Sequence, residues 1–579
     1  MMISLFYYSK TMDSYEKSKM FTKRYKKLKI LLKTIYGYES FRSRQYEIIN
    51  RIINGEDVCA ICNTGYGKSA CFQIPAVYLD KPAIVVSPLI SLMEDQQLIL
   101  DDLGISSCCY NSNVSDKWQM KKDIMQFKYK IIYITPESIV KMKDFLVALE
   151  EKQGISLIAI DEAHCISSYG FNFRKDYREL TFFKELLPEV PILALTATAT
   201  KVVGKDICKV LGFKNTEPIK TSFDRPNLYM EVRKKSKIND KITDTNTGKI
   251  CVIKSESEKI THDIIPIIKK HANKSIIIYC ISKKETVKIS KILKAHNITC
   301  SYYHAARDAD KKTKVHHDFL KNKINVIVAT IAFGMGINKP DVRVVIHYGC
   351  PKNIEGYYQE IGRAGRDGKK SYCYAFYSPQ DFFVQRGFIE NGNNSAYKKT
   401  QLELLEKMQR YMETKNCRRE LLLEYFDEDA PDKCDFCDNC CGVHKETYSK
   451  IITTTQNVEK EAKLLIELIE SIKTRKFGIG MYINILRGSS SKNITSLMKK
   501  SKLYGAGKHR SAAWWKEMSD NLLKIEFLRQ DYLKSGRFPM RVVTVTNNGS
   551  EWANMSDLNG LLGGLSVNKL EPMIMTTAI

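Results

Sequence analysis

Short continuous runs of apolar residues recur along the first two thirds of the chain, separated by polar, helix-like stretches. Runs of four or five apolar residues without alternation are typical of strands buried on both faces, as in a parallel sheet covered by helices. The first set lies within residues 25–220 and comprises Val58–Ile61, Ala83–Val86, Ile131–Ile134, Leu157–Ile160 and Ile192–Leu195. The pattern predicts an α/β domain over 25–220.

The same rhythm begins again near residue 260. The second set of expected strands is Ser275–Cys280, Val326–Ala329, Val344–His347 and Tyr372–Phe376. It predicts a second α/β domain over 221–385, and two such domains in series predict a cleft between them. The lysine-rich stretch Arg233–Lys259 is weakly patterned and indicates a linker or a loop insertion.

The pattern changes after residue 385 to helices and a cysteine cluster, which predict a subdomain over 386–445. Asn457–Lys473 and Ser511–Leu523 each place their apolar residues on one helix face. Two strand-like runs follow, Ile525–Leu533 and Arg537–Thr546. Helices followed by a hairpin predict a winged-helix domain over 455–555. Residues 1–24, which are basic, and 556–579 are expected to be tails.

Charge and cysteine content narrow the class of protein. The 579 residues carry a formal net charge of +26, which favours nucleic acid or an anionic membrane surface as a partner. An A·T-rich coding sequence, which would raise the number of lysines, is the alternative explanation of this charge. No stretch resembles a transmembrane helix or a signal peptide. Most of the 17 cysteines lie in apolar runs, which favours an intracellular, reducing compartment.

A phosphate-binding loop is predicted between an expected strand and an expected helix. The segment is Thr64-Gly65-Tyr66-Gly67-Lys68-Ser69. Small residues let backbone N–H groups approach a phosphate, Lys68 could reach the β- and γ-phosphates, and Ser69 could hold Mg²⁺. Cys62 stands where a strict loop of this type has its first glycine, so a chance loop of similar composition is the alternative.

Two charged segments complete a candidate hydrolytic site. Asp161 and Glu162 follow the apolar run Leu157–Ile160, where one carboxylate could hold Mg²⁺ and the other could polarise the attacking water. Arg363 and Arg366 lie three residues apart in the second domain and could reach the transferred phosphoryl group. An acidic strand cap and a surface helix with ordinary salt bridges are the alternatives for the two segments taken singly.

Four clustered cysteines form a candidate metal site with the spacing C-x16-C-x2-C-x2-C: Cys417, Cys434, Cys437 and Cys440. Four thiolates can close a tetrahedral Zn²⁺ site that leaves no position open for water, so the role would be structural. An iron–sulfur cluster also takes four cysteines and is the rival.

The order and the amino-acid sequences of the motifs resemble those of the RecQ family of superfamily 2 helicases. The segments that carry the resemblance, from about residue 25 to about residue 555, are Leu32–Gln45, Thr64–Ser69, Ser87–Leu92, Asp161–His164, Leu195–Thr200, Ala332–Pro340, Gln359–Gly368, the cysteine cluster, Lys476–Gly480 and Tyr504–Lys508. The resemblance implies two RecA-type α/β domains, a helical zinc-binding subdomain and a winged helix. It also implies ATP-driven 3′-to-5′ movement on DNA.

The resemblance assigns further roles at the nucleotide site. Tyr38 would stack on adenine, and Arg42 and Gln45 would hydrogen-bond it. Arg366 would be the arginine finger, and Arg363 a second phosphate or coupling contact. The remaining implied roles are phosphate binding by Thr64, Gly65, Gly67 and Lys68, Mg²⁺ binding by Ser69 and Asp161, general-base catalysis by Glu162, and coupling to DNA by Thr196 and Thr198.

Two segments are implied to contact DNA. Cys165–Arg174 resembles the aromatic-rich loop of the family, in which Tyr169, Phe171, Phe173 and Arg174 would touch single-stranded DNA. Tyr169 replaces the usual tryptophan and Phe171-Asn172 the usual His-Asp, which puts the coupling of DNA contact to ATP hydrolysis in doubt; burial in the core is the alternative. Tyr532, near the expected hairpin turn, is the candidate strand-separating residue, and an ordinary exposed aromatic is the alternative.

The sequence therefore predicts an ATP-dependent DNA helicase that uses ATP, Mg²⁺ and Zn²⁺ and acts on single-stranded and forked duplex DNA. Recombination or repair proteins are further candidate partners, and the nucleus or another DNA-replicating compartment is the expected location. Two rival classes are a translocase or remodeller, acting on RNA or on protein–DNA complexes with little unwinding, and a non-catalytic nucleic-acid-binding scaffold.

Overall fold

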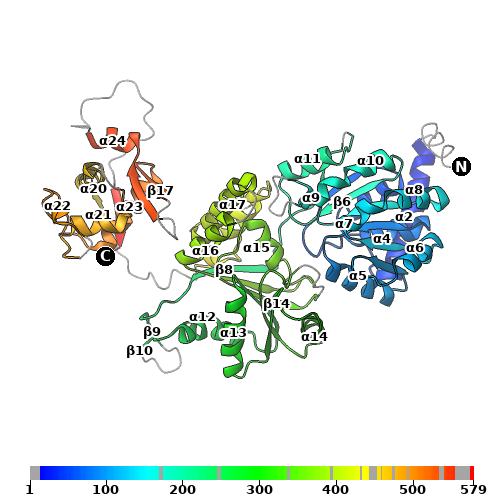
Figure 1. Cartoon of the computed structure of the whole chain (residues 1–579), viewed down its shortest axis with the longest axis horizontal. Helices are drawn as coiled ribbons and strands as arrows, with labels where there is room; N and C mark the ends of the chain where they lie inside the picture. Colours follow the sequence, from blue (N-terminus) through cyan, green and yellow to red (C-terminus); the bar gives the residue numbers. More distant parts are fainter. Residues whose placement is uncertain are drawn as a thin grey trace. The chain divides into compact units, whose positions relative to one another are not determined.

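The chain divides into two compact units, Met1–His444 and Lys445–Ile579, each with its own hydrophobic core (Figure 1). The computed structural model describes residues 14–167, 174–214, 216–243, 250–334, 339–391, 395–430, 433–442, 453–457, 459–472, 476–491, 494–533, 540–554 and 574–578. Tyr169, Phe171 and Phe173 lie outside these residues, as does 335–338 of the expected Ala332–Pro340 motif.

The first α/β domain is built on a parallel sheet of seven strands in the order β3-β4-β2-β5-β6-β1-β7. Their bounds are β1 Val58–Ile61, β2 Ala83–Val86, β3 Ser107–Tyr110, β4 Ile131–Ile134, β5 Leu157–Ile160, β6 Ile192–Thr196 and β7 Ile219–Lys220. All five predicted strands are confirmed, and β3 and β7 are additional.

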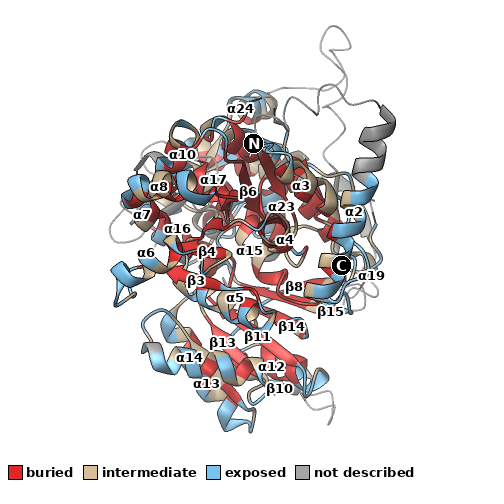
Figure 2. Cartoon of the chain, turned by 90° about the vertical axis from the view of Figure 1, so that its right-hand side faces the viewer, coloured by how far each residue is buried: buried red, intermediate tan, exposed pale blue. Residues whose placement is uncertain are grey.

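Both faces of this sheet are buried, as the continuous apolar runs predict (Figure 2). Cys59 and Ile61 of β1 belong to one core cluster, and Val58 and Ala60 to another. The covering helices are α2 Ser14–Tyr36, α3 Gln45–Ile53, α4 Ala70–Leu79, α5 Ile90–Asp102, α6 Lys117–Met125, α7 Pro136–Ile139, α8 Lys143–Gln153, α9 Lys175–Arg178, α10 Phe182–Leu186 and α11 Lys201–Val210, with short 3₁₀ turns at Val140–Met142, Ala163–Ile166 and Glu179–Thr181.

The second α/β domain has a parallel sheet of six strands in the order β12-β13-β11-β14-β15-β8. Its strands are β8 Leu228–Lys234, β11 Ser275–Cys280, β12 Cys300–Tyr303, β13 Val326–Ala329, β14 Val342–Tyr348 and β15 Ser371–Tyr377. Its helices are α12 Glu256–Lys270, α13 Lys283–Ala295, α14 Ala309–Leu320, α15 Ile354–Ile361 and α16 Pro379–Glu390. The four predicted strands are confirmed, and β8 and β12 are additional.

Three helices form the subdomain that carries the cysteines: α17 Ser395–Glu413, α18 Arg418–Tyr425 and α19 Asp438–Cys441. A buried ion pair inside this subdomain is hydrogen-bonded to the second sheet. The Nε of Arg418 lies 2.5 Å from the Oδ1 of Asp438, whose Oδ2 accepts a 2.9 Å hydrogen bond from the backbone N–H of Val232 in β8. A buried charge needs such partners to be tolerated.

The second unit contains the expected helices and hairpin. Its elements are β16 Thr453–Asn457, α20 Glu459–Ser471, α21 Ile479–Leu486, α22 Ser496–Lys499, α23 Ala512–Lys524, β17 Leu528–Leu533, β18 Met540–Val545, α24 Asn547–Asn554 and β19 Ile574–Ala578. The antiparallel pair β17–β18 follows α23, which is the order of a winged helix. The hydroxyl of Ser511 caps α23 by accepting from the N–H of Trp514 at 3.1 Å.

Three segments differ from the sequence-based expectation. Helix α2 begins at Ser14, inside the expected tail 1–24, and its residue Arg24 donates a 2.9 Å hydrogen bond to Asn50 of α3. The expected linker Arg233–Lys259 contains the hairpin strands β9, Lys241–Thr243, and β10, Ile250–Val252. In the expected tail 556–579, β19 pairs with β16. Helix α2 is held by apolar contacts of Leu28 and Leu32, whereas the two strand pairs are too short to show a pattern in the sequence. Among the described helices, none is long and apolar enough to cross a membrane.

Candidate functional site

Three neighbouring strands of the first sheet end at one edge and bring the predicted site residues together. The sheet order places β5, β6 and β1 side by side. Asp161 follows β5, Thr196 is the last residue of β6, and the loop with Lys68 follows β1. Because the carboxyl ends of parallel strands meet at one edge, this is where such sheets bind ligands.

The loop after β1 has the backbone that phosphate binding requires. Gly65 and Gly67 have φ angles of +79° and +91°, in the left-handed region that glycine adopts without strain. The Nζ of Lys68 donates to the carbonyl oxygens of Cys62 at 3.2 Å and Asn63 at 3.3 Å, so the ammonium lies inside the loop. Ser69 precedes α4, and its hydroxyl donates to the Oε1 of Gln96 at 3.0 Å.

The residues expected to bind adenine flank this loop. Gln45 donates from its Nε2 to the carbonyl of Gly67 at 3.1 Å, and its Oε1 accepts from the N–H of Arg42 at 3.1 Å. The guanidinium of Arg42 donates to the carbonyl of Gly65. Tyr38 is 57% exposed and lines the same pocket as Arg42. Arg42 and Gln45 therefore contact the phosphate loop directly, a role that the sequence did not predict.

The acidic pair lies in a buried environment. The pKa of Asp161 is raised to about 7, mainly by burial and also by the negative charge of Glu162, against the opposing charge of Lys68. Burial also raises the pKa of Glu162, opposed by the positive charges of Lys68, Arg363 and Arg174. The Oε2 of Glu162 lies 3.3 Å from the Nδ1 of His164 but accepts no hydrogen bond from the described residues. A buried carboxylate oxygen without a donor fits a site that accepts a hydrogen bond from water or substrate.

A chain of polar contacts leads from this acidic segment to the second domain. The Nδ1 of His164 lies 2.9 Å from the Oγ1 of Thr196, and burial lowers the pKa of His164 to about 3, so the ring is neutral. The N–H of Thr198 donates to the Oγ1 of Thr196 at 3.2 Å. Gln359, on α15, donates from its Nε2 to the Oγ1 of Thr198 at 3.0 Å. The two domains are thus linked beside the acidic pair.

One pocket joins the phosphate loop to the arginine segment of the second domain. Its volume is about 560 Å³, and it is lined by Tyr38, Arg42, Asn63, Thr64, Gly65, Tyr66, Arg225, Asn227, Pro340, Gly365, Arg366, Asp367 and Gly368. A Cβ on Gly65 would lie 3.4 Å from the Cγ of Arg366. The pKa of Arg366 is lowered to about 9, mainly by burial and also by the positive charges of Arg363 and Arg225. The pocket is therefore a strongly cationic site of a size that suits a nucleotide.

The four predicted cysteines meet at one point. Their sulfur atoms all lie within 4.8 Å of one another, and the Sγ atoms of Cys434 and Cys440 are 4.0 Å apart. Zn–S bonds of about 2.3 Å in a tetrahedron place sulfurs about 3.8 Å apart. Cys417 and Cys437 are buried, whereas Cys434 and Cys440 are half-buried. The donor set fits Zn²⁺ without rearrangement of the fold.

The structure places two of the expected DNA-binding residues. Arg174 donates from its Nη1 to the carbonyl of Pro88 at 3.3 Å, and its charge acts on Glu162. Tyr532 lies in β17, in register with Arg541 of β18.

Sequence reasoning missed Arg225, which joins the two domains at the pocket, and Asn227, which donates to the carbonyl of Gly365. The basic character of Arg225 was visible, but most of its partners are backbone carbonyls, which no motif reveals.

Family models match four consecutive parts of the chain. Their descriptions and ranges are DEAD/DEAH box helicase at residues 42–205, helicase conserved C-terminal domain at 258–368, RecQ zinc-binding at 379–441 and RQC domain at 452–557.

Several proteins are similar over most of the chain. A protein of Acanthamoeba polyphaga mimivirus, provisionally named an ATP-dependent RNA helicase, is 63% identical over 98% of this chain and all of its own length. The ATP-dependent DNA helicase RecQ of Bacillus subtilis is 34% identical over 94% of this chain and 85% of its own length. The bifunctional 3′-5′ exonuclease/ATP-dependent helicase WRN of Mus musculus is 38% identical over 90% of this chain but only 36% of its own length.

Proposed function

The chain belongs to the RecQ family of ATP-dependent DNA helicases, and on that premise we propose that it couples ATP hydrolysis to 3′-to-5′ movement on single-stranded DNA and to duplex unwinding. One observation carries the proposal. The phosphate loop of the first domain and the Gly365–Arg366 turn of the second domain line the same pocket. A nucleotide bound there would touch both domains, so its hydrolysis would change how they are held together.

The residues of this pocket have distinct roles in the proposed reaction. Lys68 would bind the β- and γ-phosphates, and Glu162 would take the proton of the attacking water. Arg366 would stabilise charge on the transferred phosphoryl group, with Arg363 beside it. Ser69 and Asp161 would hold Mg²⁺, which when bound neutralises phosphate charge. The burial that raises the pKa of Glu162 makes its carboxylate a stronger base.

The nucleic-acid contacts are proposed for two places. Arg174 and the aromatic residues Tyr169, Phe171 and Phe173 would bind single-stranded DNA beside the acidic pair, which Arg174 already influences. The winged helix would hold the duplex ahead of the motor, with Tyr532 of its hairpin capping the last base pair. The net charge of +26 supports a phosphate-rich partner. We also propose that forked DNA is a substrate and that recombination or repair proteins are partners. The proposed location is the nucleus or another DNA-replicating compartment.

The zinc-binding cluster has a structural role in this proposal. Cys437 directly precedes Asp438, whose carboxylate reaches β8 of the second sheet. Zinc held by the four thiolates would fix Asp438 and so attach the helical subdomain to the motor.

The choice of nucleic acid is the point to test, because the viral relative is named for RNA. ATP hydrolysis and strand displacement should be measured side by side with single-stranded and forked DNA and with RNA of the same sequence. A DNA helicase hydrolyses ATP faster with DNA and displaces the DNA strand. Displacement of RNA alone would favour an RNA helicase. Hydrolysis without displacement would favour a translocase, and no hydrolysis at all would favour a non-catalytic scaffold.

A further inference from the structure

Arg225 lies in the segment that joins the two α/β domains. The first sheet ends with β7 at Lys220, and the second begins with β8 at Leu228. The connection also touches the first domain elsewhere, since the Nδ2 of Asn63 in the phosphate loop donates to the carbonyl of Ser222 at 2.8 Å. A side chain in this connection can therefore contact both domains.

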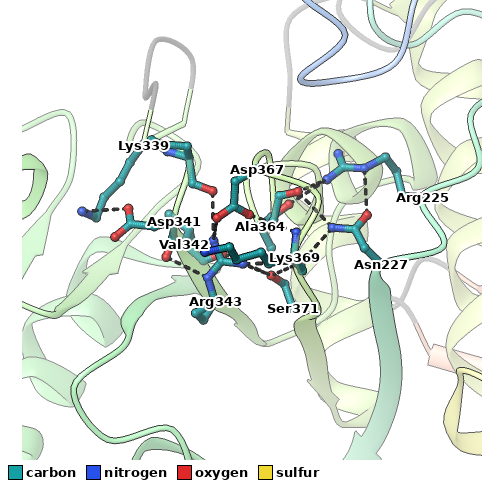
Figure 3. A network of polar contacts seen from close by, with 12 residues as sticks. Arg225, Asn227, Lys339, Asp341, Val342, Arg343, Ala364, Asp367, Lys369 and Ser371 are labelled. Carbon is teal, nitrogen blue, oxygen red and sulfur yellow. Dashed lines mark hydrogen bonds and ion pairs between the residues drawn. The ribbon is translucent and has the colours of Figure 1, made fainter.

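The guanidinium of Arg225 binds the phosphate loop and the arginine segment at the same time. Its Nη1 donates to the carbonyl of Thr64 at 3.1 Å and to the hydroxyl of Thr64 at 3.4 Å. Its Nη2 donates to the carbonyls of Ala364 and Gly365, both at 2.9 Å (Figure 3). Arg366 follows directly, so Arg225 connects Thr64 to the turn that carries the expected arginine finger.

The chemistry of this contact is specific to arginine. The Nε of Arg225 also donates to the Oδ1 of Asn227 at 3.4 Å. All five acceptors are neutral oxygens, and within the described residues no carboxylate lies within ion-pairing distance of Arg225. Burial lowers the pKa of the side chain. A planar guanidinium can direct its N–H groups to both sides at once, whereas the single ammonium of lysine cannot span them.

The turn itself is shaped for close approach. Gly365 has a φ of +57°, and a Cβ there would lie 2.4 Å from the Nδ2 of Asn227, which donates to the carbonyl of Gly365 at 2.9 Å. A Cβ on Gly362 would lie 2.0 Å from the Oγ1 of Thr64. The absence of side chains at these two glycines lets the turn lie directly against Thr64 and Asn227.

We propose that Arg225 is a positioning residue that holds the Ala364–Gly365 turn against Thr64 and thereby sets the place of Arg366 at the phosphates of ATP. The inference rests on the proposed function, because it assigns Arg225 to the same hydrolytic site. Arg225 acts through Arg366 and not on the nucleotide itself. Its loss therefore slows the chemical step and leaves the binding of ATP nearly unchanged.

The test is steady-state ATP hydrolysis with saturating single-stranded DNA for the parent, Arg225→Ala, Arg225→Lys, Arg366→Ala and the double variant. Misplacement of a reacting group by about 1 Å costs about 10²-fold, so kcat should fall about 10²-fold in Arg225→Ala, with KM for ATP within about threefold of the parent. Arg225→Lys should show the same loss of kcat. The matched control is Arg386→Ala, which should behave as the parent. Arg386 lies on α16 and pairs with Glu406 at 3.7 Å.

The double variant separates positioning from a general loss of structure. If Arg225 acts through Arg366, the double variant should be no slower than Arg366→Ala alone. A further loss in the double variant, a raised KM with normal kcat in Arg225→Ala, or full activity in Arg225→Lys would each overturn the inference. If Arg225→Ala does not fold, the pair Arg225→Lys and Arg225→Lys/Arg366→Ala gives the same comparison. A parent without DNA-stimulated hydrolysis would instead overturn the proposed function.

Discussion

Gln359 and Thr198 form a hydrogen bond of 3.0 Å between the two α/β domains, with the side-chain amide of Gln359 donating to the Oγ1 of Thr198. Through Thr196, this bond continues to His164 beside the acidic pair. The contact therefore ties the position of α15, which precedes the two arginines, to the site where water would be activated.

Removal of this contact should weaken coupling without loss of nucleotide binding. A net hydrogen bond contributes about 0.5–1.5 kcal/mol, which corresponds to about two- to tenfold in rate. DNA-stimulated hydrolysis in Thr198→Val should therefore fall by about that factor, while the affinity for a fluorescent ATP analogue stays near that of the parent. Gln359→Met should give the same loss, and the two changes together should not multiply. Multiplied losses would show that the two residues act separately.

Glu162 is expected to be the general base. Glu162→Gln should bind ATP with Mg²⁺ as the parent does but hydrolyse it about 10²–10⁴-fold more slowly, because general-base catalysis contributes a factor of that size. Turnover at saturating ATP and DNA is the measurement. Glu151→Gln, which changes an exposed glutamate on α8, is the control and should retain full turnover. Normal turnover in Glu162→Gln would assign proton transfer to another group.

The cysteine cluster predicts about one zinc ion per chain. Elemental analysis of the purified protein should show zinc, and Cys437→Ser should lower both the metal content and the yield of folded protein. Cys441→Ser is the matched control, since Cys441 is adjacent but exposed and outside the four-sulfur group. Iron in place of zinc, together with visible absorption near about 400 nm, would identify an iron–sulfur cluster instead.

Tyr532 in the hairpin of the second unit is expected to matter for strand separation more than for affinity. Stacking on one aromatic contributes about 1–3 kcal/mol per base, whereas phosphate contacts supply most of the binding. Tyr532→Ala should keep DNA-stimulated hydrolysis and bind forked DNA nearly normally but unwind it slowly. Trp118→Ala removes an aromatic that is 70% exposed on α6 and should unwind normally. Equal unwinding by Tyr532→Ala and the parent would show that another residue separates the strands. Phe538 would then be the next residue to test.

The strands of the two large sheets that the sequence failed to predict share one property. Strands β3 and β7 are the two edges of the first sheet, and β8 and β12 are the two edges of the second. The sequences of these edge strands contain polar residues that interrupt the continuous apolar pattern, although β3 is buried along its whole length. The sequence Leu228–Lys234 of β8, for example, includes Glu231 and Arg233. Interior strands must be apolar on both faces, which is why all of them were predicted.

The candidate site shows a similar division. Lys68, Asp161 and Arg366 could be recognised because their roles depend on side-chain type in a fixed local pattern. The contacts of Arg42 with Gly65 and of Arg225 with Thr64 could not, because they join residues far apart in sequence through backbone oxygens. Such contacts appear only when the fold brings the backbone of one segment to the side chain of another.

We propose that ATP hydrolysis at the Lys68 site drives the separation of DNA strands. The direct measurement is displacement of a labelled strand from a forked DNA duplex by the parent and by Lys68→Ala, with and without ATP, at matched DNA binding. We expect ATP-dependent displacement by the parent and none by Lys68→Ala, because this ammonium would bind the transferred phosphate. Displacement by Lys68→Ala at the rate of the parent, or no displacement by the parent with ATP, would contradict it.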